Sequence, residues 1–192
     1  MKIGFLGGSF DPVHFGHLCA AQEACEQHEL DRLIFVPAAQ VPLKTEPARA
    51  SGRDRLAMLQ AAIEGNGLFS ISDYELNKSG VSYTIDSVRH FRAQFAQDRL
   101  FWIIGGDQLA QLSRWKEIEQ LARLIEFIVV DRPGHPAAAQ PNIPGLRLHR
   151  CEGRLIDISS SELRERMRRH LPLDYFVPAK TLSYIREKNL YR

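Results

Sequence analysis

"KIGFLGGSFDPVHFGHL", residues 2–18, combines an apolar run, a glycine pair and the start of a helical pattern. The run at 2–6 predicts a buried strand, and helical spacing begins at Phe15. Between them, Gly7 and Gly8 let the backbone turn tightly and let a ligand approach it. The first N–H groups of a helix have no partners within it, and the helix dipole is positive at that end. The stretch therefore predicts a phosphate-binding junction between a strand and a helix.

The alternation of strand and helix continues along the chain. Further strands are predicted at 32–38, 69–76, 100–106, 125–130, 146–149 and 154–158. Helices are predicted at 15–30, 52–65, 84–95, 108–124, 160–170 and about 178–188, and a surface loop at 131–145. This rhythm predicts an α/β fold, a Rossmann-like, doubly wound and mostly parallel sheet with helices on both faces. Such folds bind ligands at the carboxyl ends of their strands.

Length and charge restrict the classes of function. We expect one domain over residues 1–192, with a helical part at about 159–192 packed against the rest. The 25 Lys and Arg against 23 Asp and Glu leave a formal charge of +2, too little for a general nucleic-acid binder. No apolar stretch approaches membrane-spanning length, so neither export nor a membrane partner is expected. The oligomeric state is not fixed by these features.

The cysteines indicate the compartment. The chain has three cysteines, Cys19, Cys25 and Cys151, and their spacing shows no pairs. We therefore expect neither a disulfide framework nor a zinc knuckle. A reducing cytoplasm fits this pattern best.

Two histidines stand three apart at the predicted junction. His14 begins the helix and His17 follows one turn later, so both could donate hydrogen bonds to one phosphate as charge builds in a transition state. The alternative makes His14 a helix cap and His17 a core residue. A metalloprotease zinc pair would be spaced i, i+4 with a glutamate between, and the glycines lack the G-x-G-x-x-G order of a dinucleotide site.

A second anion site is predicted at "ISSSELR", which ends at Arg164. Ser159 and Glu162 form a capping-box pattern, which accounts for helix initiation alone. The capping box does not explain Ser160, Ser161 and Arg164. Two hydroxyls at the start of a helix, with a guanidinium one turn later, are suited to binding an anion. The alternative for Arg164 is a solvated basic helix face.

Three further positions have polar or aromatic side chains at predicted junctions. Asp107 follows a strand that ends in two glycines, where its carboxylate could accept from both hydroxyls of a ribose or cap the next helix. Ser82, Tyr83 and Thr84 open a helix whose N–H groups favour a carboxylate over a neutral amide. Trp115 could stack on a ligand ring or belong to the core.

These motifs together resemble a known superfamily. "GGSFDPVHFGHL" resembles the H-x-G-H signature of the nucleotidylyltransferases, and "ISSSELR" resembles its partner motif I-S-S-[ST]-x-x-R. Between and after them, "SYTID", "GGDQL", Trp115, "VVDRPG" and the terminal "VP…YI…LY" resemble bacterial nicotinate mononucleotide adenylyltransferases, in the same order over nearly the whole length.

The resemblance implies transfer of the adenylyl group of ATP to nicotinate mononucleotide, giving nicotinate adenine dinucleotide and pyrophosphate in NAD biosynthesis. It implies Mg²⁺ carried by the ATP phosphates, with no metal ligands from the protein. The implied catalytic residues are His14, His17 and Arg164. The implied ATP contacts are Gly7, Gly8, Ser9, Phe10, His14, His17, Ser159, Ser160, Ser161 and Arg164. The implied contacts of the second substrate are Lys44, Ser82, Tyr83, Thr84, Asp107 and Trp115, with Asp107 on a ribose and Trp115 on the pyridine ring.

One loop departs from the family pattern. Relatives commonly carry P-P-H-K where this chain reads "VPLK", with Val41 and Leu43 replacing the first proline and the histidine. Lys44 remains a candidate phosphate contact. Two alternatives stay open at this point: an adenylyltransferase for another acceptor, such as nicotinamide mononucleotide or phosphopantetheine, and a non-catalytic nucleotide-binding sensor.

Overall fold

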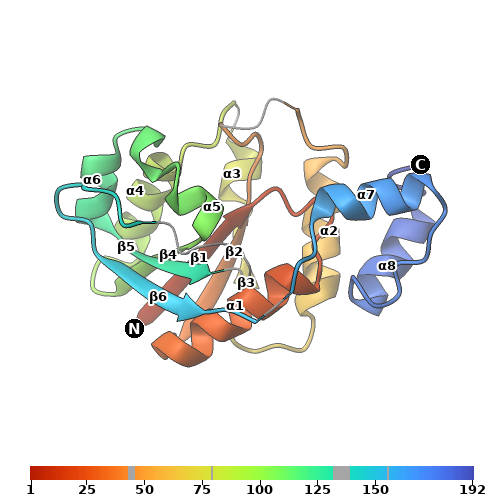
Figure 1. Cartoon of the computed structure of the whole chain (residues 1–192), viewed down its shortest axis with the longest axis horizontal. Helices are drawn as coiled ribbons and strands as arrows, with labels where there is room; N and C mark the ends of the chain where they lie inside the picture. The colour runs from red at the N-terminus through yellow and green to blue at the C-terminus, as the bar shows by residue number, and fades with distance from the viewer. Residues whose placement is uncertain (43–45, 79, 132–138, 155) are drawn as a thin grey trace.

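The structure, a computed structural model, describes residues 1–42, 46–78, 80–131, 139–154 and 156–192. Within these residues, six strands form one sheet in the order β3-β2-β1-β4-β5-β6, and every neighbouring pair is parallel (Figure 1). The strands are β1 (Lys2–Gly8), β2 (Arg32–Pro37), β3 (Phe69–Ile71), β4 (Arg99–Gly105), β5 (Glu126–Asp131) and β6 (Leu148–Glu152). This order is that of a doubly wound sheet, which confirms the predicted fold class.

Helices cover both faces of the sheet (Figure 1). They are α1 (Phe15–His28), α2 (Gly52–Ile63), α3 (Tyr74–Asn77), α4 (Thr84–Gln94), α5 (Gly106–Leu109), α6 (Ile118–Leu124), α7 (Ser160–Arg168) and α8 (Ala179–Glu187), with a 3₁₀ turn, η1, at Leu112–Arg114. Strand side chains alternate between the faces: Phe101 and Ile103 pack with α1 and α2, whereas Leu100 and Trp102 pack with α4 and α6. The sheet is thus buried on both sides, as a parallel sheet requires.

One predicted strand is too long and a second is wrong. The strand predicted at 69–76 is confirmed only as far as Ile71, and α3 follows, in which Glu75 accepts a hydrogen bond from Ser87 Oγ at 2.5 Å. At 154–158, Arg154 and residues 156–158 lie in neither helix nor strand. The final strand ends earlier, at Glu152, which lies opposite Asp131, the last residue of β5.

The helix predicted at 108–124 is broken into α5, η1 and α6. Trp115 has an extended backbone after η1, and Glu117 is in the left-handed region with φ of 53°. Such residues cannot continue an α-helix. The interruption leaves Trp115 in a connecting segment that faces the functional site.

The last helix, α8, packs against α2, and α7 packs with α8 through a small apolar cluster. Leu163, Leu173, Val177 and Leu182 form a small apolar cluster within this part. On α8, Thr181 Oγ1 donates to the carbonyl of Met58 at 3.2 Å, and Tyr184 Oη donates to Asp54 Oδ1 at 3.0 Å. These contacts fix α8 beside α2 (Figure 1).

None of the helices in the described ranges has the length and apolar character needed to cross a bilayer.

Candidate active site

A cavity of about 720 Å³ opens at the carboxyl ends of the central strands. It lies where the strand order reverses between β1 and β4, the position at which doubly wound folds bind ligands. Ten of the residues predicted from the sequence line this one cavity: Gly7, Gly8, Ser9, His14, His17, Ser82, Tyr83, Thr84, Asp107 and Trp115.

The remaining predicted residues lie elsewhere. Phe10 is only 1% exposed, and its ring packs in the core with its edge toward His17, so any contact of Phe10 with ATP would involve its backbone. Ser159, Ser160, Ser161 and Arg164 lie beside the entrance of α1 rather than in the lining. Lys44 lies outside the described residues.

The two histidine rings lie against each other in a tilted arrangement at the start of α1. Their ring centroids are 3.7 Å apart with an interplanar angle of 31°. His17 Nδ1 accepts a hydrogen bond from the backbone N–H of His14 at 3.3 Å. Because a neutral imidazole has one donor and one acceptor nitrogen, we infer that Nε2 of His17 carries the proton. His14 and His17 both line the cavity.

Gly16 allows this arrangement. A Cβ atom added at Gly16 would lie 3.0 Å from Nδ1 and 3.1 Å from Cε1 of His14. His14 is only 2% exposed, so its ring has little room to retreat. A side chain at this position of the H-x-G-H motif would therefore press on the neighbouring His14 ring.

The start of α4 forms a second wall of the cavity. Ser82 is buried, and its Oγ accepts from the backbone N–H of Ala39 at 3.0 Å, which ties this turn to the segment after β2. Glu75 lies below the turn, where burial raises the pKa of its carboxyl despite hydrogen bonds from Ser87 and Ser82. Thr84 is the first residue of α4, so helix N–H groups face the cavity at this point.

Asp107 is not the cap of its helix. Gly105 is the N-cap residue of α5, and its N–H donates to Gln108 Oε1 at 3.0 Å. Asp107 is exposed and lines the cavity. The alternative interpretation of Asp107 as a helix cap is therefore wrong.

Trp115 belongs to both the cavity wall and the core. It is half-buried, its ring meets Phe127 edge-on with centroids 6.3 Å apart, and it lines the cavity. Next to it, Lys116 Nζ lies 4.4 Å from the centroid of the Tyr83 ring. Sequence reasoning missed Lys116, because an isolated lysine in a helical pattern gives no signal that separates it from a solvated side chain.

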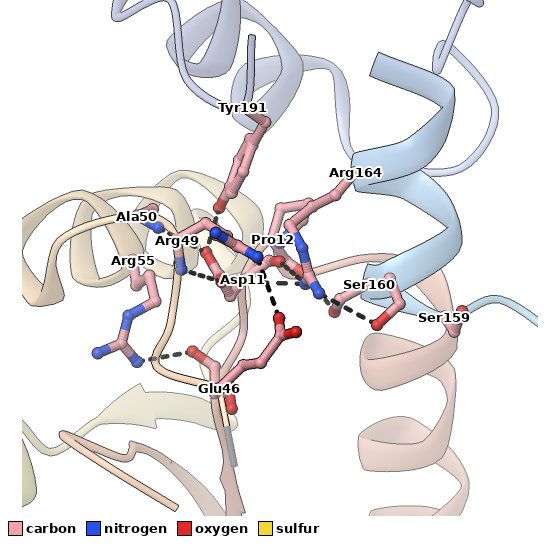
Figure 2. A network of polar contacts seen from close by, with 12 residues as sticks. Asp11, Pro12, Glu46, Arg49, Ala50, Arg55, Ser159, Ser160, Arg164 and Tyr191 are labelled. Atoms are coloured by element: carbon pink, nitrogen blue, oxygen red, sulfur yellow. Dashed lines mark hydrogen bonds and ion pairs between the residues drawn. The ribbon is translucent and has the colours of Figure 1, made fainter. Parts of the chain in front are cut away.

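The two signatures at opposite ends of the sequence meet in space (Figure 2). Ser160 Oγ donates to the carbonyl of Pro12 at 2.9 Å. Arg164 Nη1 donates to the carbonyl of Asp11 at 2.8 Å, and Arg164 Nη2 donates to Ser161 Oγ at 3.1 Å. Ser159 caps α7, with Oγ accepting from the backbone N–H of Glu162 at 3.1 Å. Thus α7 is hydrogen-bonded to the loop that enters α1.

Two buried charged residues that support this loop were missed from the sequence. Asp11 is 3% exposed, and Arg55 is 2% exposed. Arg55 Nη1 donates to the carbonyls of Ser9 and Ala38, each at 2.7 Å. A weak signal existed, since Arg55 lies one helical turn before the apolar Met58 and Leu59.

Known proteins resemble this chain over most of its length. A family model described as cytidylyltransferase-like matches residues 5–166. A probable nicotinate-nucleotide adenylyltransferase of Opitutus terrae is 62% identical over 192 residues, covering 100% of this chain and 98% of that protein. One from Shouchella clausii is 40% identical over 190 residues, covering 99% and 96%. The solved Plasmodium falciparum nicotinic acid mononucleotide adenylyltransferase complexed with NaAD has a TM-score of 0.79 at 20% identity, covering 99% and 97%, which is a likeness of fold.

Proposed function

The chain belongs to the cytidylyltransferase-like family and, within it, to the nicotinate-nucleotide adenylyltransferases, and from this premise we propose how its residues perform the reaction. The enzyme transfers the adenylyl group of ATP to nicotinate mononucleotide, giving nicotinate adenine dinucleotide and pyrophosphate, in NAD biosynthesis. One observation carries the assignment of roles: the two histidines, the start of α4 and Asp107 line a single cavity.

The first junction is proposed to hold the α-phosphate of ATP. Gly7, Gly8 and Ser9 bring backbone close to the ligand, and the start of α1 contributes N–H groups and a positive dipole end. His17 is proposed to donate from Nε2 to the same anion, through a hydrogen bond that strengthens as negative charge develops. His14 supports His17 by ring contact and adds a second imidazole at the phosphate.

The chemical step needs little beyond positioning. An oxygen of the mononucleotide phosphate attacks the α-phosphorus in line, and the bond from that phosphorus to the bridging oxygen of the β-phosphate breaks. Pyrophosphate leaves with the bonding electrons. Because the nucleophile is already an anion, no general base is required, and catalysis comes from alignment and from offsetting charge.

The pyridine nucleotide is proposed to occupy the side of the cavity formed by α4 and α5. The helix start at Thr84 favours the carboxylate of nicotinate over a neutral amide, and the nearby Lys116 cation acts in the same direction. Trp115 stacks on the pyridine ring, and Asp107 accepts from the hydroxyls of a ribose. Lys44 remains a candidate phosphate contact on the basis of the sequence alone.

The β- and γ-phosphates are proposed to lie toward α7. A guanidinium has five N–H donors, so Arg164 can hold the carbonyl of Asp11 and still donate to phosphate oxygens. Ser159, Ser160 and Ser161 stand at the start of α7 beside it.

Mg²⁺ is proposed to arrive as part of the nucleotide substrate. Mg²⁺ gives up its waters reluctantly and binds substrate phosphates more readily than an all-protein cage, so an ion held by phosphate oxygens and water is proposed. Bound in this way, the ion would offset the charge of the triphosphate. A cytoplasmic location is proposed from the three cysteines, Cys19, Cys25 and Cys151, which are free thiols, the state expected in a reducing compartment.

An acceptor panel tests the proposal. The protein is incubated with ATP, Mg²⁺ and either nicotinate mononucleotide, nicotinamide mononucleotide or phosphopantetheine, and pyrophosphate release is followed. The nicotinate compound should give a kcat/KM at least about tenfold above either alternative, since one well-placed charge contact contributes on the order of 1.4 kcal/mol. Faster release with phosphopantetheine, or ATP binding without any release, would refute the assignment.

A further inference from the structure

We propose that Tyr191 is a positioning residue which, through Asp11, sets the place of Arg164 beside the triphosphate. The inference rests on the proposed function, in which Arg164 contacts ATP. Tyr191 itself does not line the cavity and touches no group assigned to the substrates. Its connection to the site is a chain of hydrogen bonds that runs through one buried carboxylate (Figure 2).

The carboxylate of Asp11 is the centre of this network. Its Oδ1 accepts from the hydroxyl of Tyr191 at 2.8 Å and from the backbone N–H of Ala50 at 3.0 Å. Its Oδ2 accepts from the backbone N–H of Arg49 at 2.7 Å. The Asp11 side chain is only 4% exposed, so these three donors replace the water that a surface carboxylate would bind.

The backbone of the same residue holds Arg164. The carbonyl of Asp11 accepts from Arg164 Nη1 at 2.8 Å, and Oδ2 lies 3.9 Å from the same nitrogen. Pro12 follows directly, and its carbonyl is held by Ser160. Asp11 lies between Phe10, which is in the left-handed region with φ of 48°, and the ring of Pro12. Little local freedom is left, so a shift of the carboxylate displaces the carbonyl and the guanidinium hydrogen-bonded to it.

Tyr191 reaches Asp11 through an unusual backbone path. After α8, Asn189 and Tyr191 both have a backbone in the left-handed region, with φ of 52° and 67°. Residues other than glycine are uncommon in this conformation. The ring of Tyr191 packs against the core near Met58, and the hydroxyl lies 3.9 Å from Met58 Sδ. Burial first, and then the charge of Asp11, raise the pKa of the Tyr191 hydroxyl, so it remains a protonated donor. An aromatic ring without a hydroxyl would pack against the core equally well, so the hydroxyl of Tyr191 is explained by its hydrogen bond to Asp11.

The first experiment compares two hydroxyl deletions. Tyr191→Phe keeps the ring and removes the donor to Asp11. Tyr184→Phe is the matched control, because Tyr184 on α8 also donates to an aspartate, Asp54, at 3.0 Å, and that aspartate is hydrogen-bonded to Ser51 rather than to Arg164. We expect Tyr191→Phe to lower kcat about fivefold to tenfold with the KM for nicotinate mononucleotide unchanged, and Tyr184→Phe to stay within about twofold. Melting temperatures of both variants show whether stability differs between them.

The second experiment is a double-mutant cycle with Arg164→Ala. If Tyr191 acts through Arg164, then Tyr191→Phe should lower kcat in the parent but cause no further loss in the Arg164→Ala background. Equal losses in both backgrounds, or no loss from Tyr191→Phe in the parent, would overturn the positioning role.

The cycle also separates this inference from the proposed function. Arg164→Ala alone should lower kcat by about a hundredfold, as expected when a donor to transition-state charge is removed. An unchanged kcat in Arg164→Ala would remove Arg164 from the proposed mechanism. A large loss in Arg164→Ala together with a normal Tyr191→Phe enzyme would refute only the role of Tyr191.

Discussion

The backbone N–H of His14 donates to Nδ1 of His17 at 3.3 Å, so one histidine fixes the tautomer of the other. This hydrogen bond identifies Nε2 of His17 as the protonated nitrogen, and His17 lines the cavity. A phosphate donor therefore exists in the neutral imidazole, and phosphate binding does not require an imidazolium. The H-x-G-H motif thus provides both the imidazole ring of His17 and the hydrogen bond that fixes its tautomer.

Replacing His17 by alanine tests this donor. His17→Ala should lower kcat by about 10²–10³-fold, because a hydrogen bond that strengthens in the transition state is lost, while ATP binding weakens far less. Steady-state kinetics and titration calorimetry with ATP measure the two effects. His90→Ala, on the exposed side of α4, is the control and should keep the parent rate. Unchanged turnover in His17→Ala would remove the residue from the mechanism.

The contact between Gly16 and His14 predicts a subtler effect. In Gly16→Ala the added methyl group would press on the His14 ring at 3.0 Å and disturb its contact with His17. We expect kcat to fall about tenfold, with a small loss of melting temperature. Gly67→Ala is a matched control, since a Cβ atom there meets no atom within 4 Å. Equal kinetics in the two variants would show that the close approach is unimportant.

Trp115 should affect binding more than chemistry. Trp115→Ala removes the proposed stacking surface, which contributes about 1–3 kcal/mol for a base on an aromatic side chain. The KM for nicotinate mononucleotide should therefore rise at least about fivefold, with a smaller change in kcat. Initial rates at saturating ATP measure both parameters. A variant with an unchanged KM and a lowered melting temperature would place Trp115 in the core alone.

The sequence predicts most of the elements and most of the cavity because those signals are local. Glycines after an apolar run, and polar residues at a helix start, identify junctions such as Gly7–Gly8 and Ser82–Thr84 without any tertiary information. The broken helix at Trp115 was missed, because its left-handed residue is Glu117, which carries no turn signal. The hydrogen bond between Asp11 and Tyr191 joins positions 180 apart in the sequence, and no local pattern indicates it.

Glu75 supports the substrate-facing turn by a different kind of interaction. Its carboxyl is 4% exposed, and it accepts from Ser87 Oγ at 2.5 Å. Burial raises its pKa, and the charge of Asp86 acts in the same direction, whereas the hydrogen bonds from Ser87 and Ser82 and the charge of Lys78 lower the pKa less. The folded state thus holds a proton on Glu75 more tightly than the unfolded chain does.

This raised pKa fixes the sign of a pH effect on stability. Glu75 contributes its full stability below the unfolded pKa of about 4.3, and the contribution is lost as pH rises through the higher folded pKa. Glu75→Gln mimics the protonated carboxyl, so the free energy of unfolding of this variant should increase relative to that of the parent as the pH rises above about 4.3. Urea denaturation across this range measures the difference. Glu119→Gln, on an exposed position of α6, should run parallel to the parent. A Glu75→Gln curve that also runs parallel would mean that Glu75 is ionised in the folded protein at no cost.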